Sequence, residues 1–500
     1  MNIVIRLAIL LLAGNSCALA AANSIIYLRP ADALNLNPWQ SEDLYSSEIT
    51  INIFEGLVRF KKNSTAVEPC LATAWSSTEG GKRWRFELRR GVRFHDGTPF
   101  DARAVLHTFH SRLEKKQRAY QRLSSLFSFI TSVRGIDSHT VEITLDRPYA
   151  PFLVALADSA VVIQPVRAPP QGTFLPVGTG PFRFTSWSKG RSLILGRNPD
   201  YWGGRVRLEK IIFKVMPDPL GRLLQIRNGS ADITAVQSGK EYEELSRRSD
   251  ITILSNPSIS THYLGFNTRK KPFDRMEVRA AFLHIIHKGN MVKQIFQNLA
   301  EPAFSPLPRP LFPNKKIEPQ NSFNLEVARA LLRTAGLPGG FSCSLYFADG
   351  QQGIQEIADL LAVMARKVNI TIRKVRLPFP ELVKAADRGE HDMLIMGWST
   401  GPDPDFFLSP LFTFSPGNRN RFFYENPELT RLLDEGKSTL DAGQREHIYT
   451  RALAVLKKDV PWIPLFHLID NLACNREISG LFFTPLGQAV FREVTKESTT

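Results

Sequence analysis

The sequence predicts an α/β fold, and three observations support this. Strict alternation of apolar and polar residues at 84–88 and 141–145 predicts half-exposed strands. In the second half of the chain, apolar residues spaced three and four apart predict longer helices. From residue 324 to residue 396 these helices alternate with short apolar strands, which is typical of a mostly parallel sheet covered on both sides. With 500 residues, 43% of them hydrophobic, the chain is expected to form roughly three structural units.

Capping residues mark the expected helix boundaries. Asp101 and Asn324 can cap helices that begin directly after them, because their side chains accept hydrogen bonds from free N–H groups. Gly229 and Gly336 follow the last apolar residues of two helices and predict their ends. The remaining expected elements are a proline-rich loop at 165–176, strands at 208–215, 370–375 and 393–396, an extended segment at 261–267, and helices at 219–228, 325–335, 354–367 and 380–388.

The composition is that of a globular protein, with 22% charged and 10% aromatic residues. The net charge of +15 would suit an anionic partner, but the basic residues form short scattered clusters. Since no cluster is interleaved with aromatic residues, nucleic-acid binding is not expected. Cys70, Cys343 and Cys474 follow the N-terminal segment, and the sequence leaves open whether any two of them pair.

Residues 1–20 are expected to be a signal peptide. Arg6 precedes an apolar run at 7–13, and Ala18-Leu-Ala20 fits cleavage near Ala20, with a mature start near Ala21. The apolar run is shorter than the roughly 20 residues that a membrane span needs. The residues before Cys17 lack the pattern of a lipoprotein signal, so plain export is expected.

The segment from 393 to 407 combines a buried strand with a loop suited to binding. The apolar run at 393–396 ends at Gly397-Trp398, and a loop rich in Gly, Pro and Asp follows. Ligands of open α/β sheets gather beyond the carboxyl ends of strands, where loops carry specificity. The local pattern fits equally a core tryptophan that closes the strand and a tryptophan that contacts a ligand.

A series of short motifs occurs in order along the chain, and together they resemble the extracellular solute-binding proteins of family 5, which serve peptide and nickel ABC importers. The motifs are Asn52-Ile-Phe-Glu-Gly-Leu57, Leu71-Ala72 with Trp75, Gly91-Val-Arg-Phe-His-Asp-Gly-Thr-Pro-Phe100, Val177-Gly-Thr-Gly-Pro-Phe182 with Trp187, Arg197-Asn-Pro-Asp-Tyr-Trp-Gly203, Tyr263-Leu-Gly-Phe-Asn-Thr268, Pro272-Phe273-Asp274, Val278-Arg279, the helix that ends at Gly336, the 393–407 segment, and Val460-Pro-Trp-Ile-Pro-Leu-Phe-His467.

The resemblance implies a type II periplasmic binding protein with two lobes, mixed sheets flanked by helices, and crossing strands as the hinge. An extra subdomain is expected in the first lobe, as in the large members of this class. The implied bounds are 21–59 for the first part of lobe I, 60–166 for its extra subdomain, 167–259 for its second part, 260–465 for lobe II, and 466–500 for the return to lobe I.

The implied function is capture of a peptide or similar small solute between closing lobes, with delivery to an ABC permease in the inner membrane. Such a protein would be periplasmic, monomeric and not an enzyme, with no cofactor and no metal. The expected ligand contacts are Asn37, Pro38 and Trp39 from lobe I and Gly397, Trp398, Ser399, Thr400, Asp403 and Asp405 from lobe II.

Two departures from the family pattern concern the ligand. Dipeptide- and oligopeptide-binding members place an aspartate three residues after this tryptophan, to pair with an ammonium group, whereas this chain has Gly401. The stretch 346–350 also lacks the arginine that holds a dipeptide carboxylate. Asp403 could replace the ammonium anchor if the loop is shorter. A non-peptide ligand therefore stays open as an alternative: a nickel chelate, haem, an oligosaccharide or an opine-like compound.

Other motifs have a local interpretation. His95-Asp-Gly97 predicts a turn and not a catalytic pair. The glycines at 178 and 180 predict a tight chain crossing between lobes. His284 and His287 are expected on one face of a helix, without the further ligands that a metal site needs. An exported hydrolase is disfavoured, because the sequence lacks His-Glu-x-x-His and offers no convincing catalytic triad, although Gly397-Trp-Ser399-Thr-Gly401 has the Gly-x-Ser-x-Gly spacing.

Overall fold

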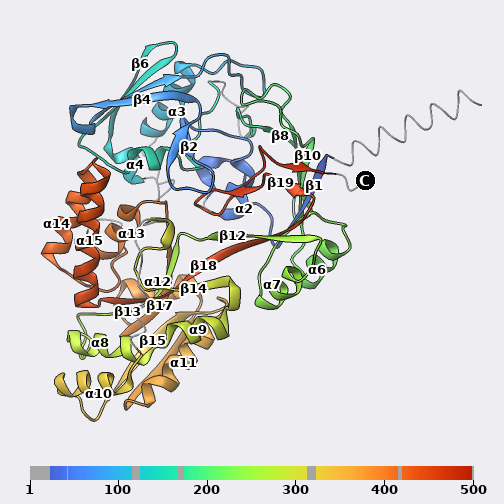
Figure 1. Ribbon diagram of the computed structural model, residues 1–500. Coiled ribbons are helices and arrows are strands. Elements are labelled where there is room, and N and C mark those ends of the chain that lie inside the picture. The colour runs from blue at the N-terminus through green and yellow to red at the C-terminus, as the bar shows by residue number, and fades with distance from the viewer. Residues whose placement is uncertain are drawn as a thin grey trace, which may run out of the picture. The chain divides into compact units, whose positions relative to one another are not determined.

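The computed structural model describes residues 23–41, 43–114, 124–166, 174–311, 323–414 and 419–497. The expected signal peptide, and part of the proline-rich loop, lie outside these ranges. The chain divides into two compact units (Figure 1). Unit 1 comprises Met1–Arg147, Phe152–Asn256 and Asp470–Thr500, as far as these are described, and unit 2 comprises Pro148–Pro151 and Pro257–Ile469.

Unit 1 is built on a mixed sheet in which β1 lies between two parallel neighbours. The strands run in the order β11, β1, β10, β9, β8, and the end of β18 pairs antiparallel with β11. β10–β1–β11 is parallel, while β8, β9 and β10 are joined antiparallel. The bounds are β1 Ser24–Arg29, β8 Phe182–Ser188, β9 Ser192–Arg197, β10 Lys210–Val215, β11 Ile233–Ala235, α6 Pro219–Arg227, α7 Gly239–Ser246 and β12 Ile251–Pro257.

A second, four-stranded antiparallel sheet lies in unit 1, in the order β4–β5–β7–β6. Helix α3 packs on β6 and β7 of this sheet. The bounds are β4 Ala72–Thr78, β5 Arg83–Leu88, α3 Ala102–Glu114, α4 Ser124–Phe129, β6 Ile130–Asp137, β7 Thr140–Leu145 and α5 Phe152–Leu156; the smaller elements of unit 1 are α2 Leu44–Thr50, β2 Val58–Phe60, β3 Val67–Pro69, β19 Ile478–Ser479, β20 Phe482–Phe483, β21 Ala489–Val490 and β22 Thr495–Lys496.

Unit 2 contains a sheet in the order β16–β15–β17–β13, followed by the first part of β18. β15 is parallel to both β16 and β17, whereas β13 is antiparallel to β17 and to β18. Helices α11 and α12 pack on β15. Helix α14 packs against both α13 and α15. The bounds are β13 Ser260–Phe266, α8 Met276–Ile285, α9 Lys288–Ile295, β14 Ala300–Pro302, α10 Leu325–Thr334, β15 Phe341–Ala348, α11 Ile354–Arg366, β16 Ile370–Leu377, α12 Phe379–Asp387, β17 Met393–Ser399, α13 Pro404–Phe412, α14 Pro427–Ser438, α15 Ala442–Asp459 and β18 Trp462–Asn475.

The predicted elements are present with nearly the expected bounds. Asn324 caps α10 by accepting hydrogen bonds from two backbone N–H groups, and Gly336 follows the helix with a φ of 69°. The parallel pairing predicted for 324–396 is confirmed, because β15 is parallel to both β16 and β17. β13 and β18 lie outside that range and pair antiparallel, so the sheet as a whole is mixed, as the resemblance implies.

Two local predictions need correction. Helix α8 ends at Ile285, the extended residue Ile286 follows, and His287 is the N-cap of α9, so His284 and His287 do not share one helix. The glycine crossing is tight as expected, since an added Cβ at Gly178 would lie 2.1 Å from the carbonyl oxygen of Ile53. Both residues lie in unit 1, however, so this crossing is not between lobes.

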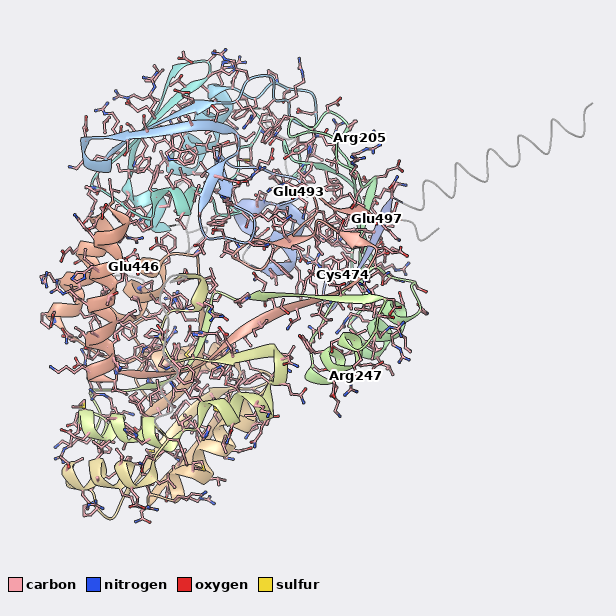
Figure 2. The ribbon with its side chains drawn as sticks, in the orientation of Figure 1. Arg205, Arg247, Glu446, Cys474, Glu493 and Glu497 are labelled. Carbon is pink, nitrogen blue, oxygen red and sulfur yellow. The ribbon has the colours of Figure 1, made fainter. Side chains whose placement is uncertain are left out.

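The three cysteines that the structure describes are buried and unpaired. Cys474, labelled in Figure 2, lies near the end of β18, with Cys70 also in unit 1 and Cys343 in unit 2. Among the residues described, no helix combines the length and apolar character that crossing a membrane would require.

Candidate functional site

The end of β17 is held in place by pairing with β13, whereas β15 pairs only with residues 393–395 of this strand. Residues 393–396 are buried, as the apolar run predicts. In the antiparallel register with β13, Gly397 lies opposite His262, and Trp398 lies opposite Thr261. The predicted Gly-Trp turn is thus part of the strand and continues its ladder as far as Ser399.

Gly397 is required because the ring of His262 occupies the space beside it. A Cβ built on Gly397 would lie 2.6 Å from Nε2 of His262. The same ring stacks on Phe466, with centroids 4.5 Å apart and an interplanar angle of 7°. Burial lowers the pKa of His262 to about 4, so the imidazole is neutral near pH 7.

Trp398 is half-buried and packs against the hydrophobic core of unit 2. Its Nε1 is buried and has no hydrogen-bond partner among the described residues. Buried indole N–H groups are normally paired, and this donor has no partner among the described residues. The ring packs against the core, so the local interpretation as a core tryptophan is consistent with the structure, and the role in ligand contact stays a prediction. Beside it, Ser399 is exposed and donates to the carbonyl of Ile259 (3.1 Å), and Thr400 is buried.

Asp403 is held in a buried ion pair. Its side chain caps α13 by accepting a hydrogen bond from the backbone N–H of Asp405 (2.8 Å). Both carboxylate oxygens also accept from Arg445 of α15, at 2.8 and 2.6 Å. Because this guanidinium already neutralises Asp403, the geometry does not support its use as the replacement ammonium anchor.

Asp405 is buried as well and accepts a hydrogen bond from Ser409 (2.5 Å). Desolvation raises the pKa of Asp405 to about 6, so a fraction of this carboxyl group is protonated near neutral pH. Gly401 is enclosed too: a Cβ there would lie 2.8 Å from Cδ2 of Phe406. An aspartate at this position would require Phe406 to move, which gives a physical reason for the departure from the family pattern.

The 346–350 segment is paired with an arginine from another strand. Nε of Arg376, on β16, donates to Asp349 at 2.7 Å. Arg376 therefore supplies a guanidinium at the end of β15, although the 346–350 segment contains no arginine. This guanidinium is already paired with the carboxylate of Asp349.

The predicted contacts of unit 1 lie in a short 3-10 turn. Asn37 caps this turn by accepting from the N–H of Trp39 (3.1 Å), and Pro38 begins it. The ring of Trp39 is 2% exposed and lies between the guanidinium of Arg112, at 4.4 Å, and Phe127. In this conformation Trp39 is a core residue, and Asn37 is the most accessible of the three. The role of all nine residues in ligand contact stays a prediction.

His95 has the structural role that its turn predicts. Its Nε2 lies 3.0 Å from the carbonyl of Gly180, and its Nδ1 accepts from the N–H of Gly178 (3.3 Å). Burial lowers the pKa of His95 to about 4, so the ring is neutral. It braces the glycine crossing and has no nucleophile beside it in these contacts.

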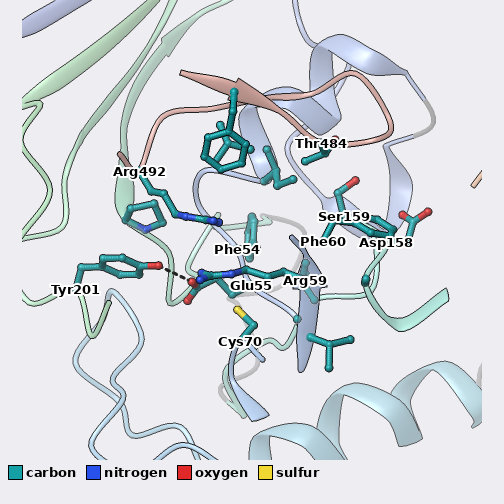
Figure 3. Close-up of a pocket in the computed structure, with 18 residues that line it drawn as sticks. Phe54, Glu55, Arg59, Phe60, Cys70, Asp158, Ser159, Tyr201, Thr484 and Arg492 are labelled. Atoms are coloured by element: carbon teal, nitrogen blue, oxygen red, sulfur yellow. Dashed lines mark hydrogen bonds between the residues drawn. The ribbon is translucent and has the colours of Figure 1, made fainter. Parts of the chain in front are cut away.

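A cavity of about 60 Å³ in unit 1 was not predicted (Figure 3). Glu55 lies in its wall and accepts hydrogen bonds from Thr179 (2.8 Å), Tyr201 (2.8 Å) and Trp202 (2.7 Å). The three donors come from motifs that the family resemblance singled out, so the sequence contained the residues but not their convergence. Since all three bonds are made within unit 1, we assign Glu55 to internal stabilisation.

Among the described residues, no group of three or more His, Cys, Asp or Glu side chains is arranged to hold a metal ion.

Comparison with known proteins identifies the family. The family model for bacterial extracellular solute-binding proteins, family 5 (middle region), matches residues 66–419, which is more than half of the chain. This chain is a family 5 solute-binding protein. The members of this family are binding proteins, and the predicted recognition is confirmed.

Relatives of this solute-binding protein match along nearly its whole length. The dipeptide-binding protein of Escherichia coli is 26% identical, over 99% of this chain and 98% of its own. Heme-binding protein A of Haemophilus influenzae is 28% identical, over 89% of this chain and 86% of its own. A probable periplasmic D,D-dipeptide-binding protein of Escherichia coli is 29% identical, over 93% and 92%.

Solved structures confirm the predicted fold class. HbpA2 from Haemophilus parasuis superposes with a TM-score of 0.87 at 25% identity, covering 95% of this chain and all of that one. The periplasmic binding protein DppA from Helicobacter pylori, in complex with the peptide STSA, gives a TM-score of 0.77 at 28% identity, covering 95% and 98%. The solute-binding protein therefore has the α/β fold of type II periplasmic binding proteins.

Proposed function

We propose that this protein is the periplasmic substrate-binding subunit of an ABC importer. It captures a peptide or similar small solute and presents it to a permease in the inner membrane. We further propose that it acts as a monomer, catalyses no reaction, and is exported after cleavage of a signal peptide near Ala20. The observation that carries this proposal is the family match over residues 66–419.

The division of the chain into two units supports a closing mechanism. The chain passes from unit 1 to unit 2 at the end of β12 and returns within β18, and the short segment Pro148–Pro151 also belongs to unit 2. The links at β12 and β18 are extended. A solute that contacts both units binds the closed state more tightly than the open state and thereby shifts the population towards closure. The lobe bounds inferred from the sequence belong to this proposal.

Peptide is the first candidate solute, because relatives named as dipeptide-binding proteins cover nearly the full chain. Specific features of unit 2 favour testing non-peptide solutes as well. Phe406 fills the space beside Gly401, and Asp403 is already paired with Arg445, so no free aspartate was found at the expected ammonium anchor within the described part of the loop. The haem-binding relative gives only weak support to haem itself.

Native mass spectrometry of the mature protein, purified without denaturation, tests the proposal directly. We expect one small solute bound per chain. A thermal-shift screen of di- and tripeptides, haem, nickel chelates, oligosaccharides and opines then identifies the class. A solute present at 100 times its dissociation constant should stabilise the protein by about 2.7 kcal/mol.

Two tryptophan variants test whether the solute binds at the end of β17. Trp398→Ala should abolish most of the stabilisation by the solute, whereas Trp75→Ala, at a half-exposed tryptophan on β4, should leave it intact. Solute binding should also reduce the radius of gyration in X-ray scattering, as closure requires. Release of hydrolysis products from a peptide library, or the failure of every solute class to bind, would contradict the proposal.

A further inference from the structure

Arg29 is a buried arginine at the carboxyl end of β1. This strand lies between two parallel neighbours, and ligands of such sheets gather beyond the carboxyl ends of their strands. Arg29 is only 2% exposed. Its single ion-pair partner among the described residues is Glu48 on α2, whose Oε2 lies 3.4 Å from Nε.

One edge of the Arg29 guanidinium makes no hydrogen bond to the described residues, although Glu48 approaches its Nε as an ion pair. Nε and Nη2 are both buried and have no hydrogen-bond partner among the residues described. These two nitrogens form the side edge of the guanidinium, which binds a carboxylate through two parallel hydrogen bonds. Arg248 of the same chain shows the filled arrangement, with Nε at 2.9 Å and Nη2 at 2.6 Å from the two oxygens of Asp250.

Glu48 does not fill that edge. Its Oε1 accepts from the hydroxyl of Tyr27 (3.2 Å) and from the backbone N–H of Ala489 (3.3 Å), which hold the carboxylate in place. Its Oε2 approaches only Nε of Arg29, so Nη2 has no acceptor within the described part of the chain. An unpaired buried donor on a charged group is costly, and native proteins rarely keep one without a use.

The surroundings of Arg29 are basic and aromatic. Arg222 is also buried, donates through Nη1 to the carbonyls of Met216 and Pro217, and likewise has an unpartnered Nε. The ring of Tyr45 lies over the Arg29 guanidinium at 4.9 Å. Phe213 also lies over the guanidinium, at 5.3 Å, and is buried, whereas Tyr45 is half-buried in the first turn of α2 and is the ring free to rotate away.

We propose that the Nε–Nη2 edge of Arg29 binds a carboxylate group of the transported solute, with Tyr45 as its movable cover. This inference rests on the proposed function and narrows it: the solute carries a carboxylate group. The ion pair of Asp403 in unit 2 is consistent with binding through a carboxylate of the solute. Asp403 is neutralised by Arg445 and would not attract an ammonium group. Glu48 acts as a positioning residue that orients the guanidinium through its ion pair with Nε.

The first experiment observes the guanidinium itself. In NMR spectra of ¹⁵N-labelled protein, the Nε–H signal of Arg29 is assigned from its loss in Arg29→Lys. Titration with succinate should shift this signal in a saturable way, while titration with succinamide, its uncharged analogue, should not. If succinate leaves the Arg29 signal unmoved, the proposal is overturned, whether or not the protein is a transport subunit.

The second experiment compares solute binding by variants. Arg29→Lys keeps a positive charge beside Glu48, so the variant should still fold. It lacks the planar Nε–Nη2 edge that would bind a carboxylate through two hydrogen bonds. We expect the wild-type protein to co-purify with a carboxylate-bearing solute and Arg29→Lys to bind it at least about tenfold more weakly. Arg248→Lys, which alters the exposed pair with Asp250, is the matched control and should bind normally.

The outcomes separate this inference from the proposed function. If Arg29→Lys binds the solute as tightly as the wild-type protein, or if the solute has no carboxylate, the role of Arg29 is refuted while the transport function stands. If the wild-type protein binds no solute of any class, the proposed function fails, and the succinate titration alone decides whether Arg29 is a carboxylate site.

Discussion

Replacing Asp403 tests whether this residue stabilises unit 2. Its side chain is 3% exposed and that of Arg445 is 16% exposed, so both charges are largely removed from water. Deleting one partner of a buried ion pair destabilises a protein by about 3–5 kcal/mol, because the other charge is left uncompensated. Asp403→Ala also removes the cap of α13, which contributes about 1 kcal/mol.

We expect a net loss of about 4 kcal/mol for Asp403→Ala, near the lower end of that sum. Arg445 retains its bond from Nε to the carbonyl of Gly436 (2.8 Å), and its partial exposure lets water solvate the freed charge. Asp403→Asn should lose about 1 kcal/mol less, because asparagine caps a helix as well as aspartate does.

Hydrogen exchange followed by mass spectrometry measures this loss locally. A decrease of about 4 kcal/mol should accelerate exchange in α13 and α15 roughly a thousandfold, with little change in unit 1. The control is Glu425→Ala: its pair with Arg269 has the same closest approach of 2.8 Å as one Arg445–Asp403 bond, but its side chains are 63% and 60% exposed, so the loss should stay below about 1 kcal/mol. If Asp403→Ala accelerates exchange in these helices less than tenfold, the assignment of Asp403 to stability is refuted.

Further predictions concern the same region and the buried thiols. Gly397→Ala should destabilise the protein by about 1–3 kcal/mol because of the contact with His262, and His262→Ala in the same chain should restore much of that loss in thermal unfolding. The pKa of His262, lowered to about 4, means that the unfolded chain takes up this proton first; stability should fall as pH decreases from 6.5 to 4, and His262→Gln should flatten the decrease. Asp405 should act in the opposite direction: its pKa is raised to about 6, so stability is lost as pH rises from about 4 to 6, and Asp405→Asn should be more stable than the wild-type protein at pH 8 but not at pH 4. The three buried cysteine thiols, whose pKa values burial raises, should react with Ellman's reagent only on unfolding, and rapid reaction of the native protein would contradict their burial.

Local chemistry explains why so many elements could be predicted from the sequence. Asn324 and Gly336 delimit α10 because a side-chain acceptor and a positive φ act within one turn of the chain. The motif order, which spans nearly the whole chain, likewise identified the family without any tertiary contact. The break between His284 and His287 was missed because Ile286 is extended although nothing in its type forbids a helix.

The candidate site shows where sequence reasoning ends. Trp398 was selected correctly as a residue at a strand end, but only the fold shows that its ring packs against the core and that its N–H has no partner among the described residues. Asp403 and Arg445 are 42 positions apart, and no local pattern pairs them.

The sequence by itself therefore determined the elements, the family and the class of function of this protein, because these depend on short-range preferences and on motif order. The tertiary structure alone decided which charges are neutralised and which buried donors lack a hydrogen bond within the described part of the chain, as at Arg29. The physical reason is that burial and pairing depend on residues far apart in the chain, which only the packed fold brings within hydrogen-bonding distance.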